Sequence, residues 1–268
     1  MLKILFVFIT FISTLYSNTL QKSIDQAPAG SIIKLQNGTY IGRLNINKPI
    51  SIIGLGKDVI IKGDGTKDVI TITSSNVTLK NIIIKNSGNR IENLDSAVLI
   101  KEVKNCLIKN CTILDSLYGI NMMMVDNSKF IGNYITSKDN DISLKGDAFK
   151  IWYCKNNIIE NNMIKYSRDT TLTYSHNNKL INNTFINNRY GTQISLSKNN
   201  IIVNNLYKYN SVGLILMGAK DTKVIKNQIL SSKGAAGMGI VTKGGENQTF
   251  KDNKISFNTH GFYIDTKE

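Results

Sequence analysis

The sequence has few of the residues that lock small folds covalently or interrupt regular structure. Its 268 residues include only 3 Cys, 2 Pro, 2 His and 1 Trp, and aromatic residues make up 8%. An odd number of cysteines without a Cys-x-x-Cys pair argues against a disulfide framework and against a zinc site. We interpret Cys106, Cys111 and Cys154 as small buried apolar residues. With 41% hydrophobic residues, the chain can bury a core without metal or disulfides.

Long apolar runs are missing except at the N-terminus. Lys3 precedes an apolar stretch from Ile4 to Tyr16, which is too short to span a bilayer comfortably, and Ser17 follows it. A charged start, a short apolar stretch and a small residue after it are typical of a secretory signal. We therefore predict a signal peptide at residues 1–17, export, and a mature domain over residues 18–268. An uncleaved anchor or a buried first strand is the alternative.

The charge balance is basic, but the basic residues are not clustered. The chain has 33 Lys and Arg against 19 Asp and Glu, which gives a formal net charge of +14. Because the lysines are scattered along the sequence, we do not expect a nucleic-acid partner. The most unusual feature is asparagine, which occurs 34 times although it is normally depleted in strands and helix interiors. Codon bias can explain this amount but not its spacing.

Asparagine recurs in pairs whose two members lie five or six residues apart, such as Asn178 and Asn183. The pairs repeat with a period of about 22 residues, a length typical of repeat proteins. The second members of successive pairs are nearly evenly spaced apart from a few longer intervals, and Asp221 fills one turn of the series. The second members are Asn81, Asn110, Asn133, Asn162, Asn183, Asn205, Asn227 and Asn253. A period that persists over so many units is the signature of a repeat architecture.

A second marker keeps the same period. A small residue precedes each of eight apolar stretches, at Ala97, Gly119, Ala148, Thr170, Gly191, Gly213, Gly239 and Gly261. Segments between the markers are short, alternating and rich in Ile and Val, which predicts strands rather than helices. Such a repeat buries its apolar side only by stacking on the next one. We therefore predict an all-β, right-handed, single-stranded parallel β-helix, in which one asparagine per rung both adopts the left-handed turn and stacks along the axis.

The ends and insertions of the coil can also be predicted. Residues 19–27 have an apolar face at helical spacing, and Pro28 ends the pattern, which predicts a short helix covering the N-terminal end. Longer repeats predict loops around residues 86–95, 138–145 and 231–236. The sequence finishes in strand pattern, so we expect this end to pair with something or to continue.

The strand alternation predicts an exposed apolar ridge. Counting from the small-residue markers, the first and third positions read as core, so the second and fourth face solvent. The fourth position holds Met123, Trp152, Tyr174 and Met217, and the second adds Leu172 and Ile215. Exposed apolar patches of this kind mark partner sites. There are two alternatives: a loop folds over the ridge, or the assignment of inward and outward positions is shifted by one residue.

Charged residues gather just before the markers of three consecutive rungs. These residues are Asp147, Arg168, Asp169 and Arg189. They form either a structural charge ladder or the polar rim of the same surface. Carboxylates on β-helices can also act on acidic polysaccharides, but paired acids at hydrolase-like spacing are not evident. We therefore do not predict an enzyme, and we interpret His176 and His260 as turn or surface residues.

Several segments resemble the NosD family of periplasmic β-helix proteins. They are Gly146 to Trp152, Tyr166 to Asp169, Arg189 to Gly191 with Tyr190 between them, and Val212 to Met217, together with the opening from Ala29 to Ile50. The resemblance runs over roughly residues 20–245. Gln193 and Ser195 stand where the family tends to carry His and then Met.

The resemblance implies a maturation factor for nitrous oxide reductase. Such a protein works with a membrane ABC transporter, an ATPase plus a permease, and with a copper chaperone, so that copper reaches the copper-sulfur centre of the reductase. Thioethers suit Cu(I), which makes Met123, Met217 and Met238 candidate transient copper ligands. The partner surface would then include Trp152 and Tyr174. A secreted protein that binds or cleaves carbohydrate near Asp147, Arg168 and Asp169 is the alternative, and a purely adhesive β-helix is a third reading.

Overall fold

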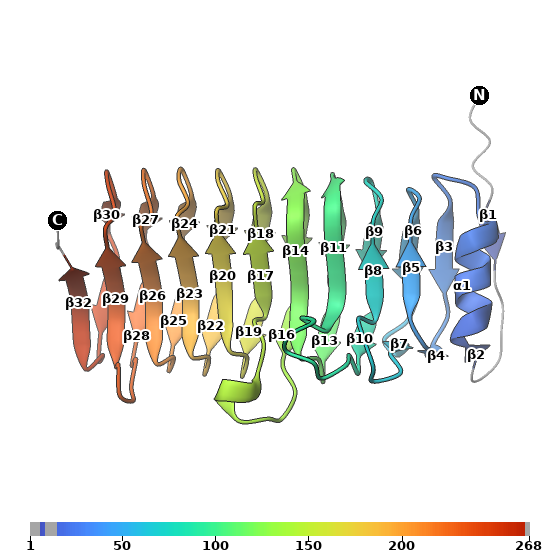
Figure 1. Cartoon of the computed structure of the whole chain (residues 1–268), viewed down its shortest axis with the longest axis horizontal. Helices are drawn as coiled ribbons and strands as arrows, with labels where there is room; N and C mark the ends of the chain where they lie inside the picture. Colours follow the sequence, from blue (N-terminus) through green and yellow to red (C-terminus); the bar gives the residue numbers. More distant parts are fainter. Residues whose placement is uncertain (1–5, 9–14, 266–268) are drawn as a thin grey trace.

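The chain winds into one long coil of parallel strands (Figure 1). The computed structural model describes residues 6–8 and 15–265. Each turn adds one strand to each of three sheets, two with 11 strands and one with 10, and strands pair with their equivalents in the neighbouring turns. The predicted parallel β-helix is therefore confirmed. Most of the predicted signal peptide, residues 1–5 and 9–14, lies outside the described residues.

Sheet A forms one side of the coil. Its strands are β1 (Phe6–Phe8), β3 (Ile32–Leu35), β6 (Ser51–Gly54), β9 (Thr78–Lys80), β12 (Leu107–Lys109), β15 (Lys129–Ile131), β18 (Ile158–Glu160), β21 (Lys179–Ile181), β24 (Ile201–Val203), β27 (Lys223–Ile225) and β30 (Thr249–Lys251).

Sheet B follows sheet A after a sharp turn in each rung. Its strands are β2 (Leu15–Tyr16), β4 (Gly38–Ile41), β7 (Val59–Lys62), β10 (Ile83–Lys85), β13 (Thr112–Leu114), β16 (Tyr134–Thr136), β19 (Met163–Lys165), β22 (Thr184–Ile186), β25 (Leu206–Lys208), β28 (Gln228–Leu230) and β31 (Lys254–Ser256).

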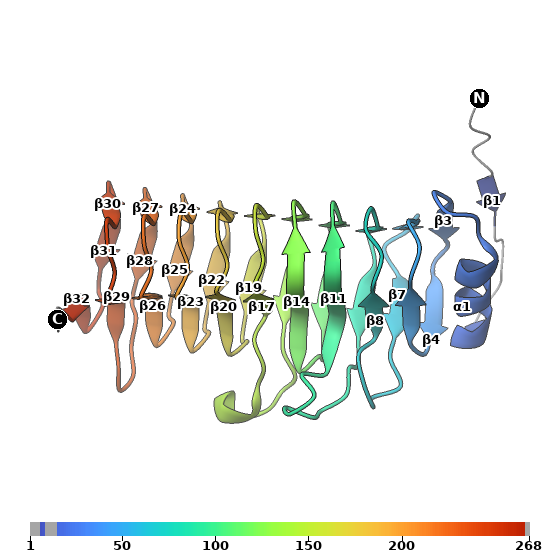
Figure 2. The same ribbon diagram turned by 45° about the horizontal axis from the view of Figure 1, so that its top comes forward.

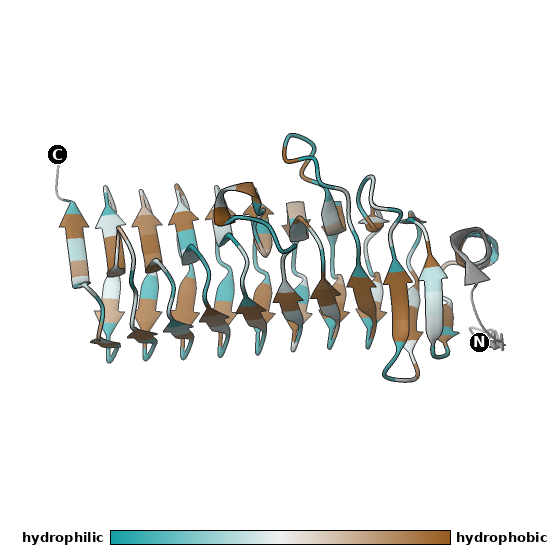
Figure 3. Cartoon of the chain, turned by 90° about the horizontal axis from the view of Figure 1, so that it is seen from below, coloured by the Kyte–Doolittle hydropathy of each residue, from teal (hydrophilic) through white to brown (hydrophobic). Residues whose placement is uncertain are grey.

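Sheet C has the longest strands and carries the candidate site. Its strands are β5 (Leu44–Ile46), β8 (Ile70–Ile72), β11 (Ser96–Lys104), β14 (Tyr118–Asp126), β17 (Phe149–Trp152), β20 (Asp169–Thr173), β23 (Tyr190–Ser195), β26 (Val212–Met217), β29 (Met238–Lys243) and β32 (His260–Asp265). The predicted loops enter sheet C on one side of the coil, and one of them contains the short helix η1 (Ile142–Leu144) (Figures 2 and 3).

The predicted helical cap is present at the N-terminal end. Helix α1 (Ser17–Gln26) buries Leu20 and Ile24 against the first rungs. Two anchors hold it there: the Lys48 ammonium donates to the Asp25 carbonyl at 2.7 Å, and Gln21 exchanges hydrogen bonds with the Asn45 backbone. The helix covers strand edges that would otherwise be open to pairing.

At the corners beside sheet A, two adjacent residues divide the two tasks that we had predicted for one asparagine. The first, such as Asn182 with φ 54°, takes the left-handed turn and is exposed. The second, such as Asn183, is buried; its Oδ1 accepts the backbone N–H of Asn162 on the previous rung, and its Nδ2 donates to Oδ1 of Asn205 on the next rung, both at 3.0 Å. For this buried column the prediction that one residue does both is wrong. It holds for left-handed Asn76 and Asn105, whose side chains share a hydrogen bond at 3.4 Å.

The small-residue marker reflects a close approach of backbones. A Cβ added at Gly213 would lie 2.4 Å from Ile229 Cγ2 and 2.6 Å from the Gly239 carbonyl oxygen of the next rung. Sheet C therefore requires a small residue at this position of most rungs, which explains its period.

Candidate functional site

The outer face of sheet C carries two distinct edges. Where the strands begin, at their lower ends in Figure 1, charged side chains gather; we name Asp147, Arg168, Asp169 and Arg189 the charged edge. Where the strands end, large apolar side chains gather; we name Met123, Met124, Trp152, Tyr153, Tyr174, Leu196 and Met217 the ladder. The two edges are separated by roughly 16 Å, the length of five strand residues.

A bulge in one rung corrects the predicted outward positions. β17 pairs with β20 so that Phe149 faces Thr170 and Ile151 faces Leu172. Leu172 is therefore fully buried, and the prediction that it belongs to the surface is wrong. The cause is an irregularity between Asp169 and Thr171 opposite β23, which shifts the inward residues of this rung by one.

Ile215 also contradicts the predicted ridge. Its register is as predicted, since it pairs with Gln193 and Val241 on the neighbouring strands, but its side chain is only 8% exposed. Its partners Gln193 and Val241 are half-buried. Ile215 therefore adds little area to the exposed surface, which is most apolar at the strand ends.

Aromatic rings form the centre of the ladder. Trp152, Tyr174 and Met217 are exposed, which agrees with their predicted orientation. The Tyr153 and Tyr174 rings stack with centroids 4.9 Å apart and an interplanar angle of 14°. The Trp152 ring meets Tyr153 edge to face, also at 4.9 Å. These contacts hold the three rings against one another.

The sequence analysis missed three members of the ladder. Met124, Tyr153 and Leu196 lie one position beyond the predicted ridge, at the corner where each strand turns away. Because of the bulge, Tyr174 belongs to this corner and not to the column of Trp152. Tyr153, Tyr174 and Leu196 follow one another at the period of the repeat, and this spacing was the signal that could have revealed them.

The charged edge is built around a buried carboxylate. Asp169 is 2% exposed, and the Arg189 guanidinium donates to both of its oxygens, from Nε at 3.0 Å and from Nη2. The Tyr190 backbone N–H also donates to Oδ1 at 3.0 Å. Nε of Arg168 lies 3.7 Å from Oδ2 and has no hydrogen-bond partner. The predicted proximity of these residues is therefore observed.

Asp147 lies beside Asp169 and Arg189, and its carboxyl group keeps its proton to a higher pH than an ordinary aspartate does. Its carboxylate is almost fully buried and accepts the Thr171 hydroxyl at 2.8 Å. Burial, followed by the negative charge of Asp169, raises the pKa of Asp147 from 3.8 to about 6. Tyr118 packs nearby, and burial and the Asp147 charge raise its pKa as well.

Asp147→Asn is expected to change how stability depends on pH. In the wild-type chain the folded state keeps the Asp147 proton up to about pH 6, whereas the unfolded state releases it near pH 3.8. Wild-type stability therefore falls as the pH rises through this window. Asparagine has no such proton and can still accept the Thr171 hydroxyl. Urea unfolding should show the variant gaining stability relative to wild type through this window and keeping that gain above it. Parallel pH profiles would contradict the assignment.

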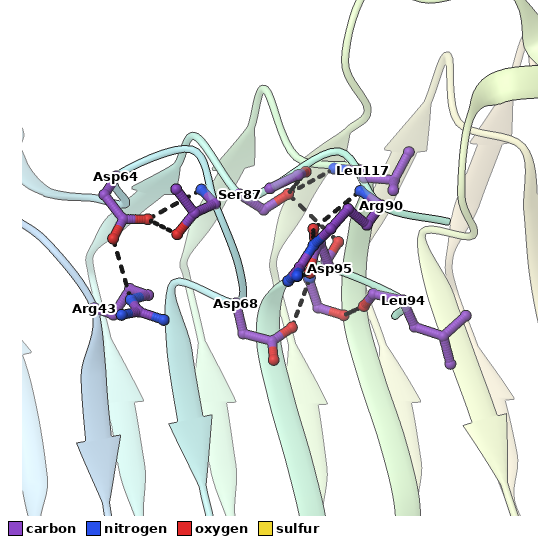
Figure 4. Close-up of polar contacts among 11 residues, drawn as sticks. Arg43, Asp64, Asp68, Ser87, Arg90, Leu94, Asp95 and Leu117 are labelled. Carbon is purple, nitrogen blue, oxygen red and sulfur yellow. Dashed lines mark hydrogen bonds and ion pairs between the residues drawn. The ribbon is translucent and has the colours of Figure 1, made fainter. Parts of the chain in front are cut away.

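A similar arrangement lies three rungs earlier on the same edge (Figure 4). Arg90 donates from Nε and Nη2 to the buried carboxylate of Asp95 at 3.0 and 2.8 Å. Asp68 on the preceding rung accepts the Ser96 backbone N–H at 2.7 Å. Burial, and to a smaller extent Asp95, raises the pKa of Asp68. Arginine-held aspartates with a second carboxylate alongside thus recur on this edge, which favours a structural role for the pattern.

Comparison with known families identifies the chain. The sequence profile of the family described as periplasmic copper-binding protein (NosD) matches residues 131–268, which is more than half of the 268 residues. The chain belongs to the NosD family. The matched part contains the whole charged edge and every ladder residue from Trp152 to Met217. No curated protein matches the chain.

Solved structures similar to this NosD-family chain are other β-helix proteins. The A-module of the mannuronan C-5 epimerase AlgE4 of Azotobacter vinelandii has a TM-score of 0.64 and 14% identity, covering 94% of this chain and 96% of that one. The surface protein and adhesin PfbA of Streptococcus pneumoniae has a TM-score of 0.53 and 12% identity, covering 91% and 94%. At these identities the likeness establishes the fold alone.

The methionines predicted as copper ligands do not converge. Met123 and Met217 lie in one column but four rungs apart, which is roughly 19 Å. Met238 begins β29 at the opposite edge of the sheet. Within residues 6–8 and 15–265, no cluster of three His, Cys, Asp or Glu could hold a metal ion. The three methionines therefore do not share one copper ion, because each belongs to a different rung or edge, and their role as separate transient ligands stays a prediction.

His176 and the cysteines are also poorly placed to bind copper. Nδ1 of His176 accepts the Lys198 backbone N–H at 3.1 Å, so the ring proton of the neutral form sits on the other nitrogen. Binding a metal there would break this hydrogen bond. The three cysteines are buried and free, and burial raises the pKa of Cys111 and Cys154 to about 12. Their predicted role as buried apolar residues is confirmed.

No helix in the described part of the chain could cross a membrane.

Proposed function

We propose that the chain is an exported, periplasmic accessory protein for nitrous oxide reductase maturation, and not an enzyme. It would work with a membrane ABC transporter and a copper chaperone so that copper reaches the copper-sulfur centre of the reductase. The observation that carries this proposal is the NosD match, because the matched residues include most of the ladder. Copper is the cargo in this proposal.

The ladder supports a docking role rather than a catalytic one. Its rigid aromatic rings offer contact area at a small cost in side-chain entropy, as do the anchors of protein interfaces. Dispersed methionines can contact Cu(I) transiently, one thioether at a time, in a chain that hands copper from one partner to another. We therefore assign partner binding to the ladder, with Trp152, Tyr174 and Met217 at its centre.

The direct test is the copper content of the reductase. Cells that lack this chain should produce reductase with a depleted copper-sulfur centre, and restoring the wild-type gene should restore it. The transport of the reductase itself should be unchanged, which serves as the control. A fully loaded and active reductase in the deletion strain would sink the proposal.

A carbohydrate function at the charged edge is the second candidate. Asp147, with its pKa raised to about 6, could act as a proton donor beside Arg168, whose Nε makes no hydrogen bond. Solved structures with this fold include a periplasmic alginate epimerase. Incubating the purified chain with an acidic polysaccharide decides between the candidates: depolymerisation or epimerisation that disappears in Asp147→Asn would favour this second function.

A further inference from the structure

The corner that ends sheet C carries side chains unsuited to its backbone. At the corners before and after sheet A strands, left-handed residues are mostly Asn, Asp or Gly, which tolerate this conformation. At the corner that ends sheet C, Glu102 (φ 56°) is followed on the next four rungs by Met124, Tyr153, Tyr174 and Leu196, with φ between 48° and 52°. Bulky residues are disfavoured there, and Gly218 and Gly244 show that later rungs use the favourable residue.

Packing within the chain does not account for these residues. Their exposed fractions are 45% for Met124, 46% for Tyr153, 37% for Tyr174 and 53% for Leu196. They lie on successive rungs and form one continuous column along the coil. Exposed left-handed aromatic residues also occur at the corner before sheet C, at Tyr166, Tyr209 and Phe257, but there Asn187 and Ser231 separate them. The ladder corner differs because four successive rungs carry such residues, and an uninterrupted run of strained, exposed side chains is a sign of function.

A basic column runs beside the ladder. Lys155, His176, Lys198 and Lys220 follow one another along the coil just after this corner, and the three lysines are exposed. An acidic residue stands at each end of this column, Asp126 before Lys155 and Glu246 after Lys220, and Lys220 pairs with Glu246 at 2.6 Å. The middle of the column, from Lys155 to Lys198, is therefore basic and complements a negatively charged segment beside Tyr153, Tyr174 and Leu196.

From these observations we infer that the ladder and the basic column bind an extended acidic segment of a protein that also carries apolar side chains. The segment would lie along the coil axis, with its carboxylates on the lysines and its apolar groups on Tyr153, Tyr174 and Leu196. The identity of the partner rests on the proposed function. The acidic and apolar character of the segment rests only on the ladder and the basic column.

The geometry favours a protein over a sugar or a membrane. Sugars bind to open ring faces, whereas Tyr153 and Tyr174 stack face to face on each other. Membrane-binding surfaces present a broad apolar face, whereas the ladder is a narrow row of side chains that are about half exposed. Edges of fixed rings flanked by lysines suit a mixed acidic and apolar polypeptide.

The test uses an acidic random copolymer of glutamate and tyrosine as the probe. The ladder variant is Tyr153→Asn/Tyr174→Asn in the mature chain. The control is Tyr166→Asn/Tyr209→Asn, because those tyrosines are also exposed and left-handed, at φ 52° and 59°, but lie at the opposite edge of sheet C. Asparagine relieves backbone strain in both variants, so neither should unfold at a markedly lower temperature than wild type.

The ladder variant should bind the copolymer at least about tenfold more weakly than wild type, and the control should bind within about twofold. Lys155→Gln/Lys198→Gln should weaken binding and flatten its salt dependence. Equal binding by the ladder variant and the control would overturn the inference. So would binding to phosphatidylglycerol vesicles that depends on the ladder, without binding to the copolymer. The probe requires no reductase, so copolymer binding together with normal copper loading in the deletion strain would overturn only the proposed function.

Discussion

Asn183→Ala should lower the free energy of unfolding by about 3–5 kcal/mol, which is large for one polar side chain. Oδ1 of Asn183 accepts two hydrogen bonds from Asn162, one from its backbone N–H at 3.0 Å and one from its side-chain Nδ2 at 2.9 Å. Nδ2 of Asn183 donates to the Ile159 carbonyl at 2.8 Å and to Asn205 Oδ1 at 3.0 Å. Alanine leaves these buried groups without partners, and water cannot replace the lost bonds in a fully packed corner.

The neighbouring residue provides a matched control. Asn182 has φ 54° and an exposed side chain, so Asn182→Ala loses only the tolerance of asparagine for left-handed backbone. The cost should be about 1 kcal/mol. Chemical unfolding of the two variants measures both effects. Similar losses at the two positions would mean that the buried amide column does not hold the rungs together.

Arg189→Met should cost about 3 kcal/mol, because it leaves the buried Asp169 carboxylate without its main partner. The loss should stay below the highest values seen for such changes, since Arg168 remains 3.7 Å away. Methionine keeps the apolar stem of the side chain, so the effect reports the charge.

The double variant Arg189→Met/Asp169→Asn separates charge from packing. It removes the buried charge together with its partner, and it should recover most of the stability lost in Arg189→Met. A single variant as stable as wild type at neutral pH would show that Arg168 alone compensates Asp169.

The architecture could be predicted from spacing, because stacked rungs impose one period on every column. The asparagine pairs, the small residues of sheet C and the capping helix all follow from it. The loops could be predicted for the same reason, since each lengthens its own repeat beyond the common period.

The site could be predicted only in part, because its details depend on local irregularities. The sequence of β20 does not reveal the bulge after Asp169, and this one-residue shift moved Leu172 into the core and Tyr174 to the corner. The prediction that Ile215 is exposed was wrong although its register is as predicted, because alternation gives the direction of a side chain and not the area that its neighbours leave open. The ladder members Met124, Tyr153 and Leu196 were missed because Met, Tyr and Leu rarely adopt left-handed backbone, so the sequence does not predict a corner at these positions. The run of such residues over four successive rungs is what distinguishes the ladder.

Copper per reductase molecule, measured in cells whose sole copy of this chain is Tyr153→Asn/Tyr174→Asn, tests the docking account most directly. We predict depletion close to that of the deletion strain, with normal loading in cells that carry Tyr166→Asn/Tyr209→Asn. Full copper loading with a stable, exported ladder variant would contradict the account.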